Sequence, residues 1–254
     1  MAGGLARQGL LPVVNSFASF LASRANEQIY NNASEGTKVV YALHYAGLIP
    51  AGPGKSHQSV RDVSLLAALP NMVVVQPCNA AETRLLLGWA IRDATENVAL
   101  RLAIGPSPRR IELPAGYVPR VGHGVELVDG DAALLLSYGP VMLHEALIAA
   151  ELLRARGVRV AVAAMPWLNR IDPGWLAQVA ARFPEVVVVE DHAPVGGLGD
   201  ALRRSLADSD TAPAPRVTVL GVEGWPACGT PPEALHAHGL DGASIARRVQ
   251  ALVA

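Results

Sequence analysis

The stretch MVVVQPCNAAETRLLLGWA, residues 72–90, decides the fold class of this chain. Its first four residues are apolar and three are β-branched, which predicts a strand buried on both faces that ends by Pro77. Asn79 and Glu82 then form an N-x-x-E helix start, and apolar residues recur at helical spacing over 85–90. A fully apolar strand followed by a helix is the repeating unit of a parallel sheet covered by helices, so the fold class is α/β.

The same alternation extends outward in both directions from this stretch. The segment GPSPRRIELPAGYVPRVGHG, residues 105–124, interrupts it; it is rich in proline and glycine and lacks periodicity, which is typical of an interdomain connection. We therefore predict two consecutive domains, residues 1–114 and 115–254, each a mostly parallel sheet flanked by helices. The other predicted strands are 12–16, 39–44, 99–104, 132–137, 158–164, 186–190 and 217–222, and further helices are predicted at 142–156 and 243–253.

Composition excludes several functional classes. The 254 residues are 51% hydrophobic, which is ample for buried cores, and 21 basic residues balance 22 acidic ones. Such a balance gives no field that would attract nucleic acid or an anionic membrane. The two cysteines, Cys78 and Cys228, show neither a disulfide framework nor zinc-ligand spacing, and the apolar runs are too short to span a bilayer. These features predict a soluble protein of the reducing cytoplasm.

Three stretches resemble the transketolase-like family, which includes deoxyxylulose-phosphate synthase and the β subunits of 2-oxo-acid dehydrogenases. They are AGGLARQGLLPVVNSFASFLASRANEQI (2–29), GPGKSHQSVRDVSLLAALPNMVVVQPCNAAETRLLL (52–87) and VVVVEDHAPVGGLGDAL (186–202). They occur in the order and at the spacing typical of the family. The resemblance implies an N-terminally shortened pyrimidine-binding domain followed by a transketolase C-terminal domain.

The resemblance also implies a cofactor and a partner. In such enzymes thiamine diphosphate lies between two domains: one holds the diphosphate with Mg²⁺ or Ca²⁺, and a pyrimidine-binding domain from the other chain holds the aminopyrimidine. This chain resembles the second kind, because its nearest string to the family's Gly-Asp-Gly metal motif is Asp129-Gly130-Asp131, which reads as a turn. Gly196-Gly197-Leu198-Gly199 has the wrong spacing for a dinucleotide fingerprint. We expect a separate diphosphate-binding subunit and a two-fold heteromer.

Four residues match positions that carry chemistry in the family. Phe17 and Phe20 match aromatic residues that pack on the cofactor pyrimidine, although a spacing of three also suits two core residues of a helix. His44 and His57 match histidines that face the substrate, where an imidazole can move a proton near neutral pH. Solvated histidines are the alternative for both.

The substrate side is less sharply defined by the sequence. Gly52, Pro53 and Gly54 predict a turn with little side-chain bulk, after which Lys55 points either into the pocket or into water. Arg24 and Arg101 are further candidates for binding an anionic substrate, with ordinary surface roles as the alternative. Asp191 and His192 are expected to serve a structural or interface role.

The sequence departs from the family in two places. The family's cofactor-activating glutamate belongs to a G-I-x-E-Q motif a few residues before the A-x-G-L-A segment, and residues 1–254 do not include it. A late start, a truncated chain, loss of catalysis and supply by a partner are all open. In transketolases an acidic pair precedes the Gly-Pro of this loop, and the corresponding stretch here, PAGPGKSHQ, has none. Ile104 or its neighbours occupy the region where sugar-phosphate enzymes carry a phosphate-binding arginine.

The leading hypothesis is a subunit of a split transketolase-like transferase, inactive alone, that transfers a two-carbon ketol unit with its diphosphate-binding partner. The second enzymatic hypothesis is a 2-oxo-acid dehydrogenase β subunit or a deoxyxylulose-phosphate-synthase-like enzyme. A scaffold or regulatory subunit without catalysis is the third.

Overall fold

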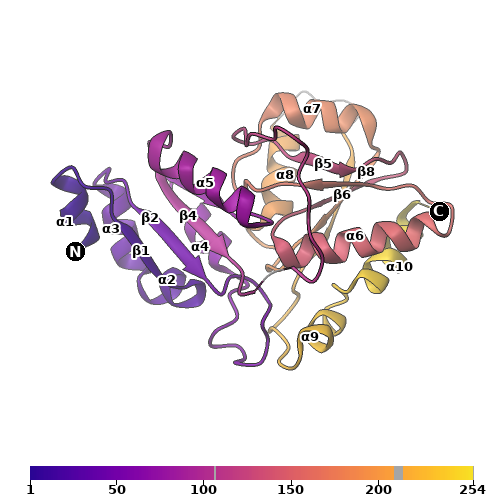
Figure 1. Cartoon of the computed structure of the whole chain (residues 1–254), viewed down its shortest axis with the longest axis horizontal. Coiled ribbons are helices and arrows are strands. Elements are labelled where there is room, and N and C mark those ends of the chain that lie inside the picture. Colours follow the sequence, from indigo (N-terminus) through magenta and orange to yellow (C-terminus); the bar gives the residue numbers. More distant parts are fainter. Residues whose placement is uncertain (106, 209–213, 254) are drawn as a thin grey trace.

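The computed structural model describes residues 1–105, 107–208 and 214–253, which form two domains side by side (Figure 1). In the first domain a parallel sheet has the strand order β1-β2-β4-β3. Its strands are β1 (Val13–Phe17), β2 (Val40–His44), β3 (Met72–Val75) and β4 (Asn97–Leu102). Its helices are α1 (Ala2–Arg7), α2 (Ala18–Arg24), α3 (Asn26–Ser34), α4 (Asp62–Ala67) and α5 (Ala80–Arg92).

The second domain is a mixed sheet with the order β5-β7-β6-β8-β9, in which β5 alone of the described strands runs antiparallel to its neighbour. Its strands are β5 (Val125–Val128), β6 (Leu134–Ser137), β7 (Ala161–Ala164), β8 (Glu185–Val189) and β9 (Arg216–Leu220). Its helices are α6 (Pro140–Arg154), α7 (Pro173–Arg182), α8 (Leu198–Ala207), α9 (Pro231–Ala237) and α10 (Gly242–Val253).

Strand order decides which face each helix covers, because parallel crossovers are right-handed. In the first sheet the chain moves one way through β1, β2 and β3 and then turns back to β4. Helices α2 and α4 therefore share one face, and α5 covers the other. In the second sheet the same rule separates α6 from α7 and α8. The helix α10 packs along α6 (Figure 1).

The predicted α/β fold is confirmed, with two mostly parallel sheets. Each predicted strand is present to within about three residues at either end. The helix start in the deciding stretch is also confirmed, since the Asn79 side chain accepts a hydrogen bond from the Glu82 amide at 2.8 Å. The sequence patterns missed β5, α1, α7 and α9, whereas α8 begins at Leu198, where the resemblance implied a helix start. The predicted boundary at Pro114 falls within the connection between the two sheets.

The edge strand β3 joins the two domains. Residues 166–169 of the second domain run along its free edge, where Gln76 donates to the Pro166 carbonyl at 2.9 Å and Leu168 donates to the Val74 carbonyl at 2.9 Å. The Asn169 amide group bonds the Val74 amide and the Met72 carbonyl. The edge is thus fully paired rather than open to water or to another chain. The hydrophobic core runs without interruption from one domain into the other.

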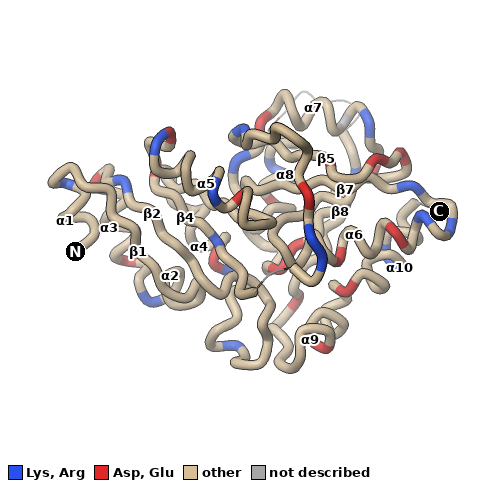
Figure 2. Tube along the Cα trace, in the orientation of Figure 1, with Lys and Arg blue, Asp and Glu red and all other residues tan. Residues whose placement is uncertain are grey.

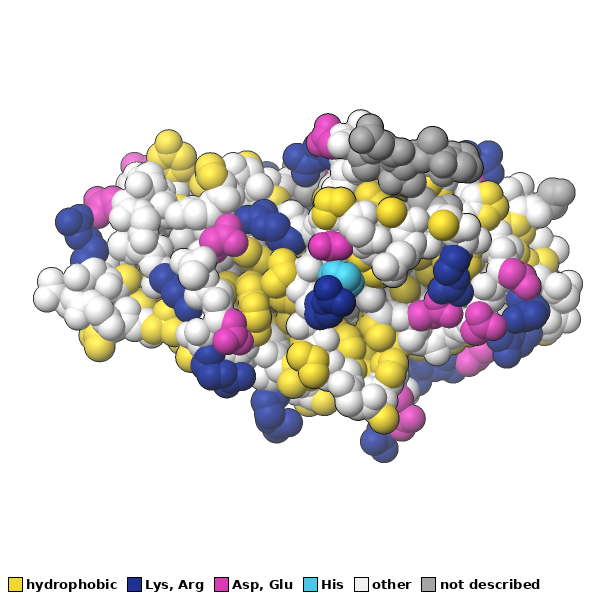
Figure 3. Space-filling view, turned by 90° about the horizontal axis from the view of Figure 1, so that it is seen from above, with side chains coloured by type: hydrophobic (Ala, Val, Ile, Leu, Met, Phe, Trp, Pro, Cys, Tyr) yellow, Lys and Arg dark blue, Asp and Glu magenta, His cyan; other side chains and the backbone are white. Residues whose placement is uncertain are grey.

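Charged groups of both signs occur on each domain. Figure 2 shows acidic and basic residues interspersed along both domains. Figure 3 shows hydrophobic side chains gathered in the middle of one face, with charged groups scattered around them. None of the helices in the described part of the chain combines the length and apolar content that crossing a bilayer requires.

Candidate active site

The carboxyl ends of β1, β2 and β4 place two of the predicted residues at one edge of the first sheet. Phe17 ends β1 and pairs in register with His44, which ends β2 and pairs with Leu102 of β4. Ligands of open parallel sheets bind outside the carboxyl ends of the strands. The edge that carries Phe17 and His44 is therefore the place to look for a site.

Four aromatic rings form a cluster at this edge, which we call the ring cluster: Phe17, Phe20, Tyr45 and His57. The Phe17 ring centre lies 5.5 Å from that of Phe20, 5.4 Å from Tyr45 and 5.6 Å from His57. His57 meets Phe20 edge-on at 5.1 Å. Phe17, Phe20 and His57 are partly exposed, so the cluster reaches the surface and is not a filled core. The structure thus brings together three of the predicted residues.

The loop between β2 and α4 carries His57 back to the cluster. Gly47 and Ser59 exchange two backbone hydrogen bonds, of 3.0 Å and 2.9 Å, which close the loop upon itself. Gly47 has φ of +89°, and a Cβ atom there would lie 1.8 Å from Oδ2 of Asp191. Only glycine satisfies both conditions. The position of His57 therefore depends on a close approach between the two domains.

His57 has a partner that orients its ring. The Ser56 hydroxyl lies 2.9 Å from Nδ1 of His57. With the hydroxyl donating, Nδ1 is the acceptor and the proton of the neutral ring sits on Nε2. The ring then presents one exchangeable proton and has its other nitrogen fixed, which suits a group that gives or takes a proton from a ligand.

Tyr45 belongs to the ring cluster although sequence reasoning did not select it. Its hydroxyl is buried and has no hydrogen-bond partner among the described residues, and burial raises the pKa of Tyr45. The hydroxyl therefore stays protonated and free to donate. Its φ of 62° is unusual for a residue with a side chain. The only signal in the sequence was its place directly after the end of a predicted strand.

His44 stands somewhat apart from the rings. It is partly exposed at the end of β2, and the ring contacts of the described residues do not include it. Its role toward a substrate stays a prediction.

The cations predicted to bind substrate separate into two groups. The Arg24 guanidinium lies 3.9 Å above the Phe20 ring, and Arg24 and Lys55 are exposed beside the cluster. Arg101 is fully buried. Its Nε donates to Asp62 at 2.8 Å, and its Nη1 donates to Gln76 and, at 3.4 Å, to Asp191. Burial alone lowers the pKa of Arg101, but the two carboxylates raise it overall. Since its donors are taken by these partners, we reassign Arg101 from substrate contact to structure.

Asp191 and His192, which follow β8, bind the second domain to the first, while the neighbouring Glu190 accepts from the Leu198 amide within the second domain. Asp191 reaches Arg101, and His192 Nδ1 donates to the Ala193 carbonyl at 2.6 Å while its Nε2 faces the Ser64 amide at 3.4 Å. Burial lowers the pKa of His192 to about 4, which agrees with a neutral ring that donates from one nitrogen and accepts at the other. Burial raises the pKa of Glu190 to about 8. The predicted structural role of Asp191 and His192 matches this geometry.

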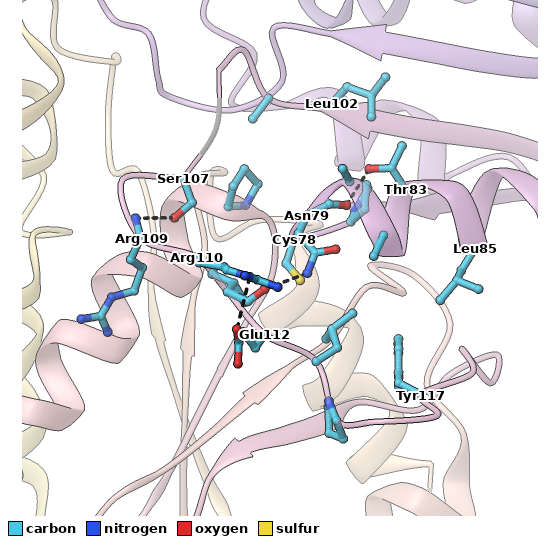
Figure 4. Close-up of a pocket in the computed structure, with 18 of the residues that line it drawn as sticks. Cys78, Asn79, Thr83, Leu85, Leu102, Ser107, Arg109, Arg110, Glu112 and Tyr117 are labelled. Carbon is cyan, nitrogen blue, oxygen red and sulfur yellow. Dashed lines mark hydrogen bonds and ion pairs between the residues drawn. The ribbon is translucent and has the colours of Figure 1, made fainter.

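A cavity of about 1140 Å³ lies beside the interdomain connection (Figure 4). Two of its lining residues donate to the buried Glu82, the Cys78 amide at 2.7 Å and the Tyr117 hydroxyl at 2.9 Å. Burial raises the pKa of Glu82, of the Cys78 thiol and of Tyr117. These bonds fasten the connection to the start of α5, and the thiol is not poised as a nucleophile.

Metal ligands are not grouped in this chain as far as it is described. Residues 1–105, 107–208 and 214–253 contain no cluster of three His, Cys, Asp or Glu side chains that could hold a metal ion. Both aspartates of Asp129-Gly130-Asp131 instead form ion pairs with Arg159, at 3.0 Å and 3.5 Å. In the stretch Gly196-Gly197-Leu198-Gly199, Gly197 is the N-cap residue of α8, so these glycines begin a helix.

Comparison with known sequences and structures gives a consistent result. Residues 1–104 match the family described as the transketolase pyrimidine-binding domain, and residues 122–245 match the transketolase C-terminal domain. A 1-deoxy-D-xylulose-5-phosphate synthase of Synechococcus sp. (strain WH7803) is 32% identical over 98% of this chain and 38% of its own length. The enzyme of the same name from Synechococcus sp. (strain JA-2-3B'a(2-13)) is 31% identical over 99% of this chain. The chain spans little more than a third of these relatives.

Among solved structures, a split gene transketolase described as an inactive beta4 tetramer is 32% identical, with a TM-score of 0.86. The match covers 98% of this chain and 78% of that one. A transketolase from Pichia stipitis in complex with sedoheptulose 7-phosphate has a TM-score of 0.75 at 17% identity, which shows a shared fold.

The buried pair of Asp62 with Arg101 leads to a prediction about stability. Asp62→Ala leaves a buried guanidinium with less compensation, and we expect the free energy of unfolding to fall by about 3–5 kcal/mol. The exposed pair of Asp129 with Arg159 is the control, because Asp129→Ala should cost about 0–1 kcal/mol. Urea unfolding of both variants followed by circular dichroism measures the difference. Equal losses in the two variants would contradict the structural role of Arg101.

The raised pKa of Glu190 predicts a pH dependence of stability. Between pH 6.5 and 8 the folded chain keeps the Glu190 proton that the unfolded chain has released, so the free energy of unfolding falls as pH rises. His192 opposes this only between about pH 4 and 6.5. Glu190→Gln should therefore lessen the fall above pH 6.5 by up to about 1.4 kcal/mol per pH unit. Glu151→Gln, at an exposed side chain, should leave the profile unchanged. A Glu190→Gln profile parallel to that of the unsubstituted chain would refute the assignment.

Proposed function

Because the chain belongs to the transketolase family of thiamine diphosphate enzymes, with its pyrimidine-binding and C-terminal domains, we propose that it is one subunit of a split transketolase-like enzyme. The proposed activity is transfer of a two-carbon ketol unit between sugars. A second subunit, carrying a diphosphate-binding domain, completes the active site and forms a two-fold heteromer with this chain in the cytoplasm. Neither subunit is active alone.

The ring cluster is the observation that supports this proposal. Phe17, Phe20 and His57 offer partly exposed ring faces and edges that suit a flat heterocycle such as an aminopyrimidine. The buried Tyr45 ring supports this wall from behind, since its centre lies 5.4 Å from that of Phe17. Thiamine diphosphate, when bound, supplies the nucleophilic carbon that carries the two-carbon unit. We propose that the partner subunit holds its diphosphate and the accompanying Mg²⁺ or Ca²⁺.

The chain's own residues then have distinct roles. His57, oriented by Ser56, gives and takes the proton of a substrate hydroxyl as carbon–carbon bonds form and break. His44, at the neighbouring strand end, contacts the same substrate. The phenylalanine rings exclude water from the reacting carbon.

The family's cofactor-activating glutamate has no counterpart in the ring cluster, which contains no carboxylate. Glu27 and Glu35 are the acidic residues that precede the end of β2, and both are exposed, on α3 and directly after it. Asp62 is buried against Arg101. We propose that a glutamate outside residues 1–254 provides this group.

A second candidate function is favoured by the curated relatives, which are named 1-deoxy-D-xylulose-5-phosphate synthases and match nearly the whole chain. In that case the assembled enzyme would decarboxylate a 2-oxo acid before forming the new carbon–carbon bond.

Reconstitution tests the function. The chain is mixed with a transketolase-like diphosphate-binding subunit from the same organism, thiamine diphosphate and Mg²⁺, and assayed for ketol transfer and for 2-oxo-acid decarboxylation. We expect ketol transfer in the mixture and none with either subunit alone. Decarboxylation without ketol transfer would establish the second candidate instead. A mixture that binds the cofactor and catalyses neither reaction would favour a scaffold.

The role of His57 is tested in the same assay. His57→Asn should lower kcat about 10²–10⁴-fold, because a positioned acid–base group contributes that much, and should leave the unfolding temperature unchanged. His236→Asn is the control, since the His236 side chain is 74% exposed and lies on α9. A His57→Asn enzyme with unchanged kcat would remove His57 from the mechanism.

A further inference from the structure

The loop that carries His57 lies against a loop of the second domain. We call residues 45–61, between β2 and α4, the histidine loop, and residues 223–229, within the connection from β9 to α9, the clamp loop. Figure 1 shows both loops near α9. Within the histidine loop, Leu48 and Ala51 are fully buried in a hydrophobic cluster that consists mostly of second-domain residues. The second domain therefore supports this loop of the first domain.

Gln58 connects the two loops. This residue follows His57 directly, and its side chain is buried. Its amide nitrogen donates to the Leu48 carbonyl at 3.0 Å within the histidine loop and to the Ala227 carbonyl at 2.8 Å in the clamp loop. Loss of a buried donor leaves the carbonyls that it satisfied without a partner, which costs stability. The neighbour of His57 is thus bound to the second domain.

Cys228 makes a second contact with the histidine loop. A Cβ atom at position 54 would lie 3.1 Å from Cys228 Sγ, and Gly54 has φ of +77°, so the loop turns on a glycine beside the thiol. The Gly54 carbonyl accepts from the His57 amide at 2.9 Å and from the Gln58 amide at 3.1 Å. The thiol therefore lies against the turn that sets the backbone of His57.

The clamp loop is held from its other side by His238, the C-cap residue of α9. Nε2 of His238 accepts from the Ala227 amide at 3.0 Å. Burial lowers the pKa of His238, which agrees with a neutral ring whose Nε2 carries no proton. Ala227 thus bonds the first domain through its carbonyl and the second domain through its amide.

The first domain gives the middle of the histidine loop a weaker support. The Ser19 hydroxyl of α2 donates to the Ser56 carbonyl at 3.2 Å, and this bond lies at the surface, where water competes for it. Of the described residues outside the histidine loop, Ser19 and Ala227 are the two that hydrogen-bond residues 48–58. Only the bond to Ala227 involves a buried side chain.

We propose that the clamp loop is a positioning element for His57. It holds the histidine loop through the hydrogen bond from Gln58 to Ala227 and through the contact of Cys228 with Gly54. Displacement of the clamp loop moves the His57 ring away from the other rings and from a bound substrate. The second domain thereby controls a group of the first domain's site. Only the catalytic consequence rests on the proposed function; the dependence of one loop on the other does not.

Proteolysis of the 254-residue chain tests this dependence without a partner or a cofactor. The chain contains two lysines, Lys38 before β2 and Lys55 in the histidine loop, so a lysine-specific protease has two sites. We expect Gln58→Met, which removes the hydrogen bonds and keeps the side-chain length, to raise the cleavage rate at Lys55 about 3- to 10-fold. Cleavage at Lys38 requires wider unfolding and should not change. Gln250→Met, which removes a hydrogen bond between α10 and Arg156, is the matched control and should change neither rate.

A thiol reagent displaces the clamp loop in the folded, unsubstituted chain. Cys228 is exposed and Cys78 is buried, so N-ethylmaleimide labels Cys228. The succinimide bonded to Sγ then lies beside Gly54, where even a Cβ atom would be at 3.1 Å. We expect the imidazole NMR signal of His57, assigned by its absence in His57→Asn, to shift, and cleavage at Lys55 to accelerate. Cys228→Ser is the control, because the same reagent should change neither measurement in that variant.

The outcomes separate the positioning role from the function. An unchanged His57 signal in the labelled chain, or equal acceleration of cleavage at Lys38 and Lys55, would overturn the proposal. If both loop measurements respond and the reconstituted enzyme catalyses neither reaction, the proposed function fails and the link between the loops stands. In an active enzyme, Gln58→Met should lower kcat about 10- to 100-fold and change KM less than about 3-fold, since small displacements of a reacting group have such effects. A loosened loop with unchanged kcat would overturn the positioning role alone. The labelled chain decides if Gln58→Met does not fold.

Discussion

A single buried guanidinium holds the architecture together. Arg101 projects from β4 of the first domain, and its neighbours are Asp62 at the start of α4, Gln76 after β3 and Asp191 after β8. Charged groups are rarely fully buried, because their hydration is lost, and they persist only where partners satisfy them. Here the partners come from both domains. The relative position of the two sheets is therefore coupled to the satisfaction of one charge.

This constraint reaches the candidate site through the loop after β2. Asp191, placed by Arg101, leaves no room for a side chain at position 47, so the loop turns there on a glycine. The Ser59 carbonyl accepts a further hydrogen bond from Arg101 at 3.4 Å, which ties the far end of the loop to the same group. Tyr45 lies two residues before Gly47, and His57 lies two residues before Ser59. Both are thus positioned by a charge that never touches a ligand.

The sequence predicted the sheets well because local patterns determine them. A run such as Met72–Val75 is buried on both faces, and a capped helix follows it, so its neighbours along the chain suffice. Sequence reasoning failed where the side chains that contact a residue lie far from it along the chain. Arg101 reads as one more arginine until Asp62 and Asp191 are seen around it. Tyr45 likewise follows a strand end like any loop residue, and its place among the rings depends on a backbone turn with φ of 62°.

The site residues were predictable to the extent that motifs carried them. Phe17, Phe20 and His57 were selected by resemblance, and the structure brings their rings together. No motif selected Arg61, because the feature that distinguishes it is the absence of a carboxylate partner among the described residues. An arginine without a carboxylate partner looks the same in a sequence as one with a partner, and only the arrangement of α2 against the loop before α4 shows that three such cations share one pocket. Because surfaces ordinarily intersperse the two signs, three cations (Arg24, Lys55 and Arg61) without an acidic partner in the described residues beside an aromatic wall are a feature that only the fold reveals.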